Sequence, residues 1–233
     1  QSKPEIAIII DDLGYDRSMA EKFLNLDQHI TLAILPHSPL QRKIATEAYQ
    51  KGIEVMLHLP MENMAGSSAG PGGLYAAMSA TEFHRALDAS FDSLPGIRGV
   101  NNHMGSRLTT MREQMDWVMQ ALAERGLFFV DSRTQAATQA AFSAQAHGLP
   151  TLSRDVFLDN VRTPEAMEAA LQVGLEKARK QGFAVIIAHP YPETLEFLSS
   201  RVARVPEQDA VQLVSLERLF ERQPALVPAA APR

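Results

Sequence analysis

The stretch EIAIIIDDLG, residues 5–14, decides the fold class of this chain. Residues 5–10 form an almost continuous apolar run, which predicts a strand covered on both faces, as in a parallel sheet packed between other layers. Asp11 and Asp12 follow at once, so two carboxylates stand where this buried strand reaches the surface. The stretch therefore indicates an α/β protein with polar chemistry at the carboxyl end of its first strand.

Similar apolar runs recur along the chain and alternate with segments of helical pattern. We expect strands at residues 5–10, 31–35, 53–57, 98–102, 127–130, 151–153, 184–188 and 211–214. A βα unit that recurs seven or eight times predicts an irregular (β/α)7–8 barrel of mostly parallel strands. A doubly wound open sheet is the alternative. We expect one domain over residues 1–222 and a disordered Ala/Pro-rich tail over 223–233.

Local signals mark where the intervening helices begin and end. The spacing of Ser18 and Glu21, and of Ser79 and Glu82, is that of a capping box, and Thr163 precedes a proline at a predicted first helical position. Glycines suited to a left-handed cap stand between helix and strand at Gly52, Gly126 and Gly182.

Composition excludes several classes of protein. The chain has 233 residues, 45% of them hydrophobic, so it can bury a sizeable core. A formal net charge of −5, with scattered basic residues, argues against a nucleic-acid partner. No run of about 18 apolar residues predicts a membrane span. Cysteine is absent, which excludes disulfides and thiolate ligands. The chain begins with Gln1, so we expect a processed product.

Titratable side chains gather directly after the predicted strands. In a parallel barrel all these strand ends open on one rim, where active sites are built. The residues are Asp11, Asp12, His58, His103, Asp131, Arg154, Asp155 and His189.

Three of these residues suit a metal site. Asp12, His58 and His103 offer a carboxylate and two imidazoles, which favours Zn²⁺ with an open position; Ni²⁺ or Co²⁺ are alternatives. Glu62, four residues after His58, is an alternative or additional ligand. Because neighbouring residues of an extended chain point opposite ways, Asp11 would face the substrate while Asp12 binds the metal.

His189 suits a general acid, or else a buried structural histidine. Asp131 and Asp155 would orient it or pair with Arg133 and Arg154. Residues 61–78 contain four glycines, which predicts a long functional or mobile loop, and residues 66–73 could form part of a contact surface.

Five ordered strings resemble the divergent polysaccharide deacetylase family, a distant relative of the NodB-type carbohydrate esterases. They are IIDDLG at 9–14, MLHLPME at 56–62, GVNNHMGS at 99–106, FVDSRT at 129–134 and IAHP at 187–190. The resemblance implies an irregular (β/α) barrel and a metal-dependent deacetylase of N- or O-acetylated polysaccharide, peptidoglycan or chitin-like. It implies Asp11 as catalytic base, Asp12 and His58 as metal ligands, and His189 as general acid.

The chain also departs from the NodB-type pattern. The second metal histidine would normally follow His58 by four residues, but Glu62 stands there, so His103 is our choice of ligand. An Arg-x-Pro-Tyr motif is absent. The supporting or substrate-binding residues would be Glu62, Asn102, Asp131, Arg133, Arg154 and Asp155.

Two functions therefore stand as expectations. The first is a metal-dependent hydrolase, exported to the periplasm or secreted, that deacetylates a glycan or peptidoglycan fragment. The alternative is a catalytically weak or inactive glycan-binding or envelope regulatory protein that keeps the metal site. A metallohydrolase acting on another amide or an ester is a third possibility.

Overall fold

The computed structural model describes residues 3–223 and 226. Within this part of the chain the strands are β1 (Glu5–Leu13), β2 (Thr31–Ile34), β3 (Glu54–Met61), β4 (Gly99–Met104), β5 (Phe128–Asp131), β6 (Thr151–Ser153), β7 (Val156–Phe157), β8 (Phe183–Ala188) and β9 (Gln212–Leu213). The α-helices are α1 (Arg17–Leu24), α2 (Gln41–Lys51), α3 (Ala80–Ser93), α4 (Arg112–Glu124), α5 (Ala140–Ala146), α6 (Pro164–Gln181), α7 (Pro192–Arg201), α8 (Val205–Gln208) and α9 (Leu216–Arg222). Two 3₁₀ turns, η1 (Leu108–Thr110) and η2 (Val202–Arg204), complete the set.

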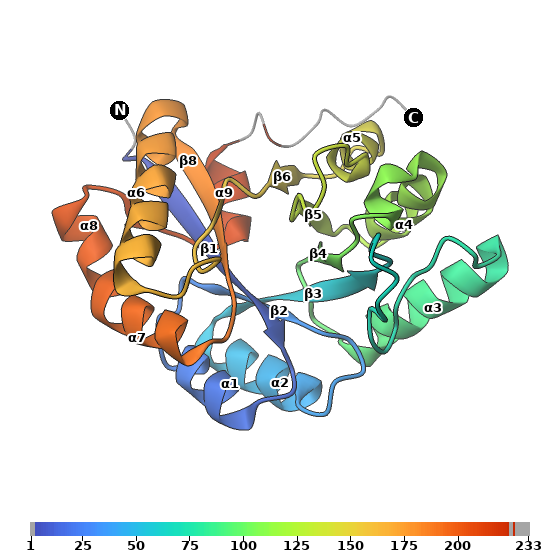
Figure 1. Cartoon of the computed structure of the whole chain (residues 1–233), viewed down its shortest axis with the longest axis horizontal. Helices are drawn as coiled ribbons and strands as arrows, with labels where there is room; N and C mark the ends of the chain where they lie inside the picture. The colour runs from blue at the N-terminus through green and yellow to red at the C-terminus, as the bar shows by residue number, and fades with distance from the viewer. Residues whose placement is uncertain (1–2, 224–225, 227–233) are drawn as a thin grey trace.

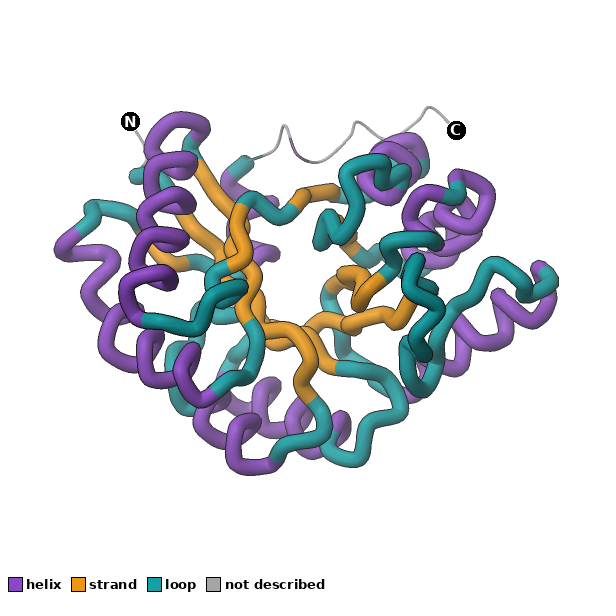
Figure 2. The backbone as a smooth tube through the Cα atoms, in the orientation of Figure 1, coloured by secondary structure: helices purple, strands orange, loops and turns teal. Residues whose placement is uncertain are grey.

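The strands form one parallel sheet that curls into a half-barrel, as Figure 2 shows. Their order is β6-β5-β4-β3-β2-β1-β8-β7, and β9 pairs with the first two residues of β1. The sheet ends at β6 and β7, which are separated in sequence only by Arg154 and Asp155. The structure therefore confirms the irregular (β/α) barrel of mostly parallel strands.

The strands are longer at their carboxyl ends than the apolar runs predict. β1 continues to Leu13, β3 to Met61 and β4 to Met104, so the expected metal ligands Asp12, His58 and His103 lie within strands and not beyond them. The two-residue strand β7 was not predicted. It pairs with β8 through Val156 and Phe157.

Most of the predicted helix signals are confirmed. Ser79 and Glu82 form a full capping box, and Thr163 caps α6 ahead of its proline. Gly52 and Gly182 adopt the left-handed conformation at helix ends. The prediction for α1 was wrong: Asp16, and not Ser18, accepts the capping hydrogen bond, which comes from the Met19 amide.

Two apolar layers cover the two faces of the sheet. On the outer face, Ile6, Ile8 and Ile10 of β1 pack in a cluster with residues of the surrounding helices (Figure 1). On the inner face, Ala7 and Ile9 belong to a smaller cluster that α9 closes with its apolar side chains, Leu216, Leu219 and Phe220. Both faces of β1 are therefore buried, which explains its continuous apolar run.

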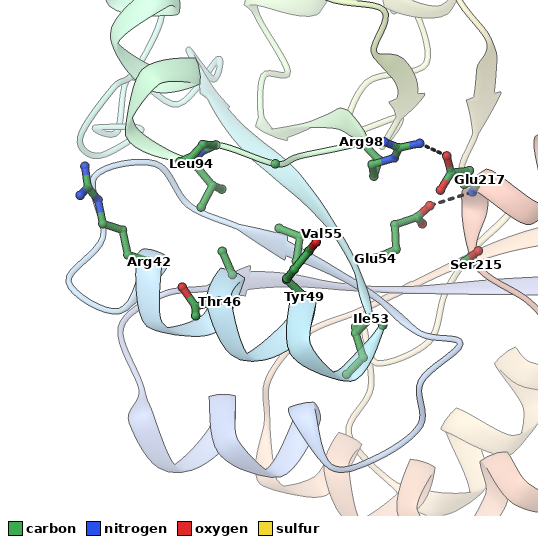
Figure 3. A pocket seen from close by; sticks show the side chains of 14 residues that line it. Arg42, Thr46, Tyr49, Ile53, Glu54, Val55, Leu94, Arg98, Ser215 and Glu217 are labelled. Carbon is green, nitrogen blue, oxygen red and sulfur yellow. Dashed lines mark hydrogen bonds and ion pairs between the residues drawn. The ribbon is translucent and has the colours of Figure 1, made fainter.

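Helix α9 is tied to the amino-terminal edge of the sheet through Glu54. The Glu54 carboxylate accepts hydrogen bonds from the backbone amides of Leu216 (2.9 Å) and Glu217 (2.8 Å) and from the Thr31 hydroxyl (2.6 Å). Arg98 forms an ion pair with Glu217 (Figure 3). Glu54, Arg98 and Glu217 border a groove that also runs along α2, at the amino-terminal end of β3 (Figure 3); its volume is about 560 Å³.

The expected tail, residues 223–233, lies outside the described residues apart from Gln223, which ends α9, and Leu226, which packs against the inner cluster.

Candidate metal centre

Asp12 is placed by an irregularity in β1. The pairing of β1 with β2 shifts register between Ile10 and Leu13, and Asp12 has a φ of +58°. A residue other than glycine seldom adopts this left-handed conformation, and a bulge of this kind re-aims a side chain. The extended geometry expected for Asp11 and Asp12 is therefore wrong, because the backbone turns between the two carboxylates.

Asp12, His58 and His103 converge as predicted. Asp12 Oδ1 lies 3.0 Å from His58 Nε2 and 3.0 Å from His103 Nδ1, and the two ring nitrogens are 3.0 Å apart. His58 comes from β3 and His103 from β4, where they are offset by two residues in the parallel register. Three donor atoms, one each from β1, β3 and β4, thus form a nearly equilateral triangle.

This triangle fits a divalent ion by its chemistry and its size. One carboxylate and two imidazoles form the donor set of many zinc sites with an open position. Ligand atoms about 2.0–2.2 Å from a shared ion lie roughly 3 Å from one another, the spacing seen here. Among the residues that the structure describes, this is the one group of three or more acidic and histidine side chains close enough to share an ion.

Asn101 fixes the orientation of the His58 ring. Its Oδ1 lies 2.8 Å from His58 Nδ1, and its Nδ2 donates to Asp11 Oδ1 at 2.8 Å. Because Asn101 Oδ1 can only accept, Nδ1 carries a proton, and Nε2 is the nitrogen that would lose its proton and offer a lone pair to a metal ion. Asn101 was not among the predicted site residues; its neighbour Asn102 was.

Asp11 is buried on the far side of the His58 ring. Its Oδ1 lies 3.6 Å from His58 Nδ1, whereas Asp12 approaches Nε2. Two consecutive carboxylates therefore contact the two nitrogens of one imidazole.

Burial and the two carboxylates shape the proton equilibria here. Burial raises the pKa of Asp11, an effect that His58 and Asn101 only partly oppose. Burial alone would lower the pKa of His58, but Asp11 and Asp12 outweigh it and raise the value to about 9. Burial also acts against ionised Asp12, yet hydrogen bonds with His103 and His58 hold the pKa of its carboxyl well below the usual range. Protons and a cation would compete for these atoms.

His189 lies just past the end of β8 and is oriented by a carboxylate that the sequence analysis missed. Asp159 Oδ1 lies 2.8 Å from His189 Nδ1, while Asp159 Oδ2 accepts the His189 backbone amide (2.7 Å) and the Thr194 hydroxyl (2.8 Å). Burial acts against protonation of His189, but Asp159, with help from Asp11 and Asp12, raises its pKa. The expected partners Asp131 and Asp155 make other contacts.

Asp131 and Asp155 stabilise local backbone instead. Asp131 accepts hydrogen bonds from the Arg133 amide (2.8 Å) and the Thr138 hydroxyl (2.9 Å) within its own turn. Asp155 accepts the Val185 amide at 2.8 Å and lies 3.4 Å from Lys177 Nζ. Neither forms an ion pair with Arg133 or Arg154 among the described residues, so the expected pairing is wrong.

Glu62 and Asn102 also hold loops around the site in place through hydrogen bonds. Glu62 accepts from the Ala76 amide (2.6 Å) and from Arg107 Nη1 (2.8 Å), and it is not part of the metal triangle. The expectation that it is a ligand is therefore corrected: it fixes the segment between β3 and α3. Asn102 joins β4 to β5, because its Oδ1 accepts the Ser132 amide at 2.9 Å.

A cavity of about 230 Å³ adjoins the metal triangle at His103. Tyr15 and Pro60 contribute to its wall, and residues 68–71 of the glycine-rich loop complete it. The loop that the sequence singled out therefore borders the candidate site.

Comparison with known proteins identifies relatives along nearly the whole chain. The profile of the divergent polysaccharide deacetylase family matches residues 8–220. The uncharacterized protein YibQ of Escherichia coli K12 is 36% identical over 202 residues, which cover 87% of this chain and 63% of YibQ. The chain thus spans somewhat under two thirds of the length of that relative.

Solved structures share the fold. The uncharacterized protein ATU2773 of Agrobacterium tumefaciens C58 superposes with a TM-score of 0.89 at 23% identity, covering 94% of this chain and 90% of that one. Peptidoglycan deacetylase PdaC of Bacillus subtilis gives a TM-score of 0.52 at 14% identity, covering 96% and 93%. At these identities the likeness concerns the fold alone. None of the helices in the described part is long and apolar enough to cross a bilayer.

Proposed function

We propose that this chain, which belongs to the divergent polysaccharide deacetylase family, is a metal-dependent hydrolase that removes acetyl groups from an N- or O-acetylated polysaccharide such as peptidoglycan or a chitin-like amino sugar. One observation carries the proposal. The Asp12–His58–His103 triangle opens on the same rim of the sheet as a His189 whose free ring nitrogen is set by Asp159.

The triangle would hold the ion, for which Zn²⁺ suits the donor set best. When bound, this ion would supply Lewis-acid chemistry, polarising the acetyl carbonyl and lowering the pKa of attacking water. The protein keeps the site ready for it, since Asn101 holds the His58 ring in the tautomer that offers Nε2.

Asp11 is our candidate for the base that takes a proton from water. Its buried carboxyl has a raised pKa, which makes it a better proton acceptor than an exposed aspartate. The hydrogen bond from Asn101 fixes one of its oxygens.

His189 is our candidate for the acid that protonates the leaving group. Asp159 accepts a hydrogen bond from Nδ1, so Nε2 is left to face the substrate. The Asp159 carboxylate also favours the protonated imidazole. A protonated His189 could give its proton to the departing amine or alcohol. The Thr194 hydroxyl and the His189 amide hold Asp159 in place.

The substrate would approach over the loop of residues 68–71. The cavity beside His103, with Tyr15 on its wall, offers the apolar and aromatic surface on which a sugar ring can pack. We further propose a periplasmic or secreted location, where such glycans occur; fractionation of cells producing the tagged chain tests it.

The central experiment measures metal content and deacetylation together. We expect about one equivalent of metal per chain. We also expect acetate to be released from acetylated chito-oligosaccharides or peptidoglycan fragments, with the loss of acetyl groups monitored by mass spectrometry. Asp11→Asn should keep the metal and lose turnover, whereas Asp88→Asn, an exposed change on α3, should keep both.

Two results would redirect the proposal. Metal and glycan binding without any product over long incubation would favour the glycan-binding or regulatory function. Turnover of simple esters but not of acetylated sugars would indicate a different hydrolase.

A further inference from the structure

Two arginine side chains stack on aromatic rings that flank His189. The guanidinium of Arg154 lies 3.8 Å from the centre of the Phe157 ring, and that of Arg162 lies 3.8 Å from the centre of the Tyr191 ring. The two rings lie 6.0 and 5.8 Å from the His189 ring. Each of the two cations therefore stands one aromatic ring away from the candidate acid.

Arg154 is held rigidly in this position. Its Nε donates to the Ser132 carbonyl at 2.8 Å and its Nη2 to the Arg133 carbonyl at 3.1 Å. The guanidinium is half-buried: the two hydrogen bonds occupy one of its edges, and the Phe157 ring covers one of its faces. A planar group fixed in this way presents its remaining donors in a defined direction.

The positive charge of this group is not neutralised within the described part of the chain. Arg133, Arg154 and Arg162 have no carboxylate oxygen within 4.0 Å there, and the acids nearby are engaged elsewhere: Asp155 with Lys177 and Asp159 with His189. Burial and the neighbouring charge of Arg133 lower the pKa of Arg154, effects that Asp131 and Asp155 only partly oppose. An anion placed here would be stabilised.

The backbone beneath the group is strained. Arg133 has a φ of +52°, a conformation that costs free energy for a residue with a Cβ. Asp131 Oδ1 holds the turn by accepting the Arg133 amide at 2.8 Å, and Arg154 holds its carbonyl. Strain that is maintained by a buried carboxylate and a guanidinium is typical of ligand clamps.

We propose that Arg154, with Arg133 beside it, and Arg162, on its own ring, bind anionic oxygen groups of the glycan substrate near the acetyl group that is removed. This inference rests on the proposed deacetylase function and narrows its substrate to acidic glycans. The arginine fork fits a carboxylate of a sugar acid or a phosphate substituent. Neutral chito-oligosaccharides would then be poor substrates.

The test compares pairs of substrates in which one member carries an anionic group that the other lacks. A muramic-acid tetrasaccharide with free lactyl carboxylates is measured against its methyl ester, and a chito-tetraose against its 6-phosphorylated form. We expect kcat/KM to be at least tenfold higher for each acid than for its neutral partner, with the larger ratio identifying the anion. The preference should shrink as ionic strength rises.

Arginine variants assign the preference to this group. Arg154→Gln and Arg162→Gln should each lower the acid-to-ester ratio several-fold. Arg162 is exposed and makes no hydrogen bond to the backbone of the described residues, so its variant controls for a folding defect in the Arg154 variant. Arg218→Gln, the same charge change on α9 at the opposite end of the sheet, should leave the ratio unchanged.

The outcomes separate this inference from the proposed function. Equal rates on acid and ester overturn the anion site while the deacetylase stands. Calorimetric binding of the acid tenfold tighter than the ester, with no acetate released, supports the anion site and contradicts the hydrolase. A preference that survives in both arginine variants also overturns the assignment.

Discussion

Asn101 lies opposite His58 in the parallel pairing of β3 and β4, and its Oδ1 accepts a hydrogen bond from His58 Nδ1 at 2.8 Å. The same side chain donates to Asp11, so one amide sets the ring that would bind the metal and the carboxylate that would act as base. An amide serves both because it offers an acceptor and a donor at once.

Replacing Asn101 should therefore weaken metal binding without removing a ligand. We expect Asn101→Leu to lower zinc affinity roughly 10- to 100-fold, the usual effect of losing a partner that orients a metal-bound histidine. Competition with a chromogenic chelator measures it. Asn25→Ala, an exposed change at the end of α1, serves as the control. Unchanged affinity in Asn101→Leu would mean that the ring needs no such support.

Removal of a ligand should abolish the site. Asp12→Ala and His103→Ala should each lose stoichiometric metal after reconstitution, because the triangle then has two donor atoms. Elemental analysis checks this, with His84→Ala on α3 as the matched histidine control. Full metal content in either ligand variant would refute the assigned donor set.

The pH dependence of turnover should report on Asp159. As a general acid His189 must be protonated, so activity falls as the pH rises through its pKa. Asp159 raises that pKa, so Asp159→Asn should move the fall in kcat to lower pH. Thr194→Val removes a hydrogen bond to Asp159 but no charge, and should cause a smaller displacement. His189→Ala should lower kcat roughly 10²- to 10⁴-fold. If the fall in kcat at high pH occurs at the same pH in Asp159→Asn as in the wild type, His189 is not the group that causes it.

A buried ion-pair cluster between α6, α7 and the segment after α8 should govern stability. Arg201 is almost fully buried; its Nη1 lies 2.8 Å from Asp209 Oδ2 and its Nε 3.0 Å from Glu168 Oε2. Arg201→Ala should lower the free energy of unfolding in urea by about 3–5 kcal/mol, because it leaves the largely buried Asp209 with only the more distant Arg179, at 3.8 Å, as an ion-pair partner. A loss below about 1 kcal/mol would show that the cluster is solvated.

The same cluster predicts an acid limb of stability. The hydrogen bond with Arg201 lowers the pKa of Glu168, so its contribution is present above the unfolded pKa of about 4.3 and is lost as pH falls through the folded value. Glu168→Gln should flatten this part of the profile. Glu176→Gln, exposed on the same helix, should not. Parallel profiles for wild type and Glu168→Gln would contradict the assignment.

The apolar runs predicted the sheet because burial on both faces leaves a continuous signal, as in β1. They could not show where β1, β3 and β4 end, since each strand continues past a polar residue: Asp12 in β1, His58 in β3 and His103 in β4. Asp16 was missed as a cap because Ser18 has the better sequence spacing.

The metal triangle was predictable because its members are chemically distinctive. Asn101 could have been predicted as a site residue. It stands two residues before His103 and therefore lies on the same face of β4, whereas Asn102 lies on the other face. Nothing in the sequence indicated Asp159. It follows a strand of only two residues, and its partner His189 is 30 residues away in the sequence. Contacts of that kind depend on tertiary structure.

The pairing of β1 has a consequence for how the chain folds during synthesis. Residues Glu5–Ile10 align with Phe183–Ala188, and Glu5 also pairs with Gln212 and contacts Arg222. Pairing between residues so far apart in sequence slows folding, because the entropic cost of closing the loop comes before the stabilising contacts form. β1 is therefore among the last strands of this domain to be fully paired, and a nascent chain would keep one unpaired apolar edge until β8 and β9 have been synthesised.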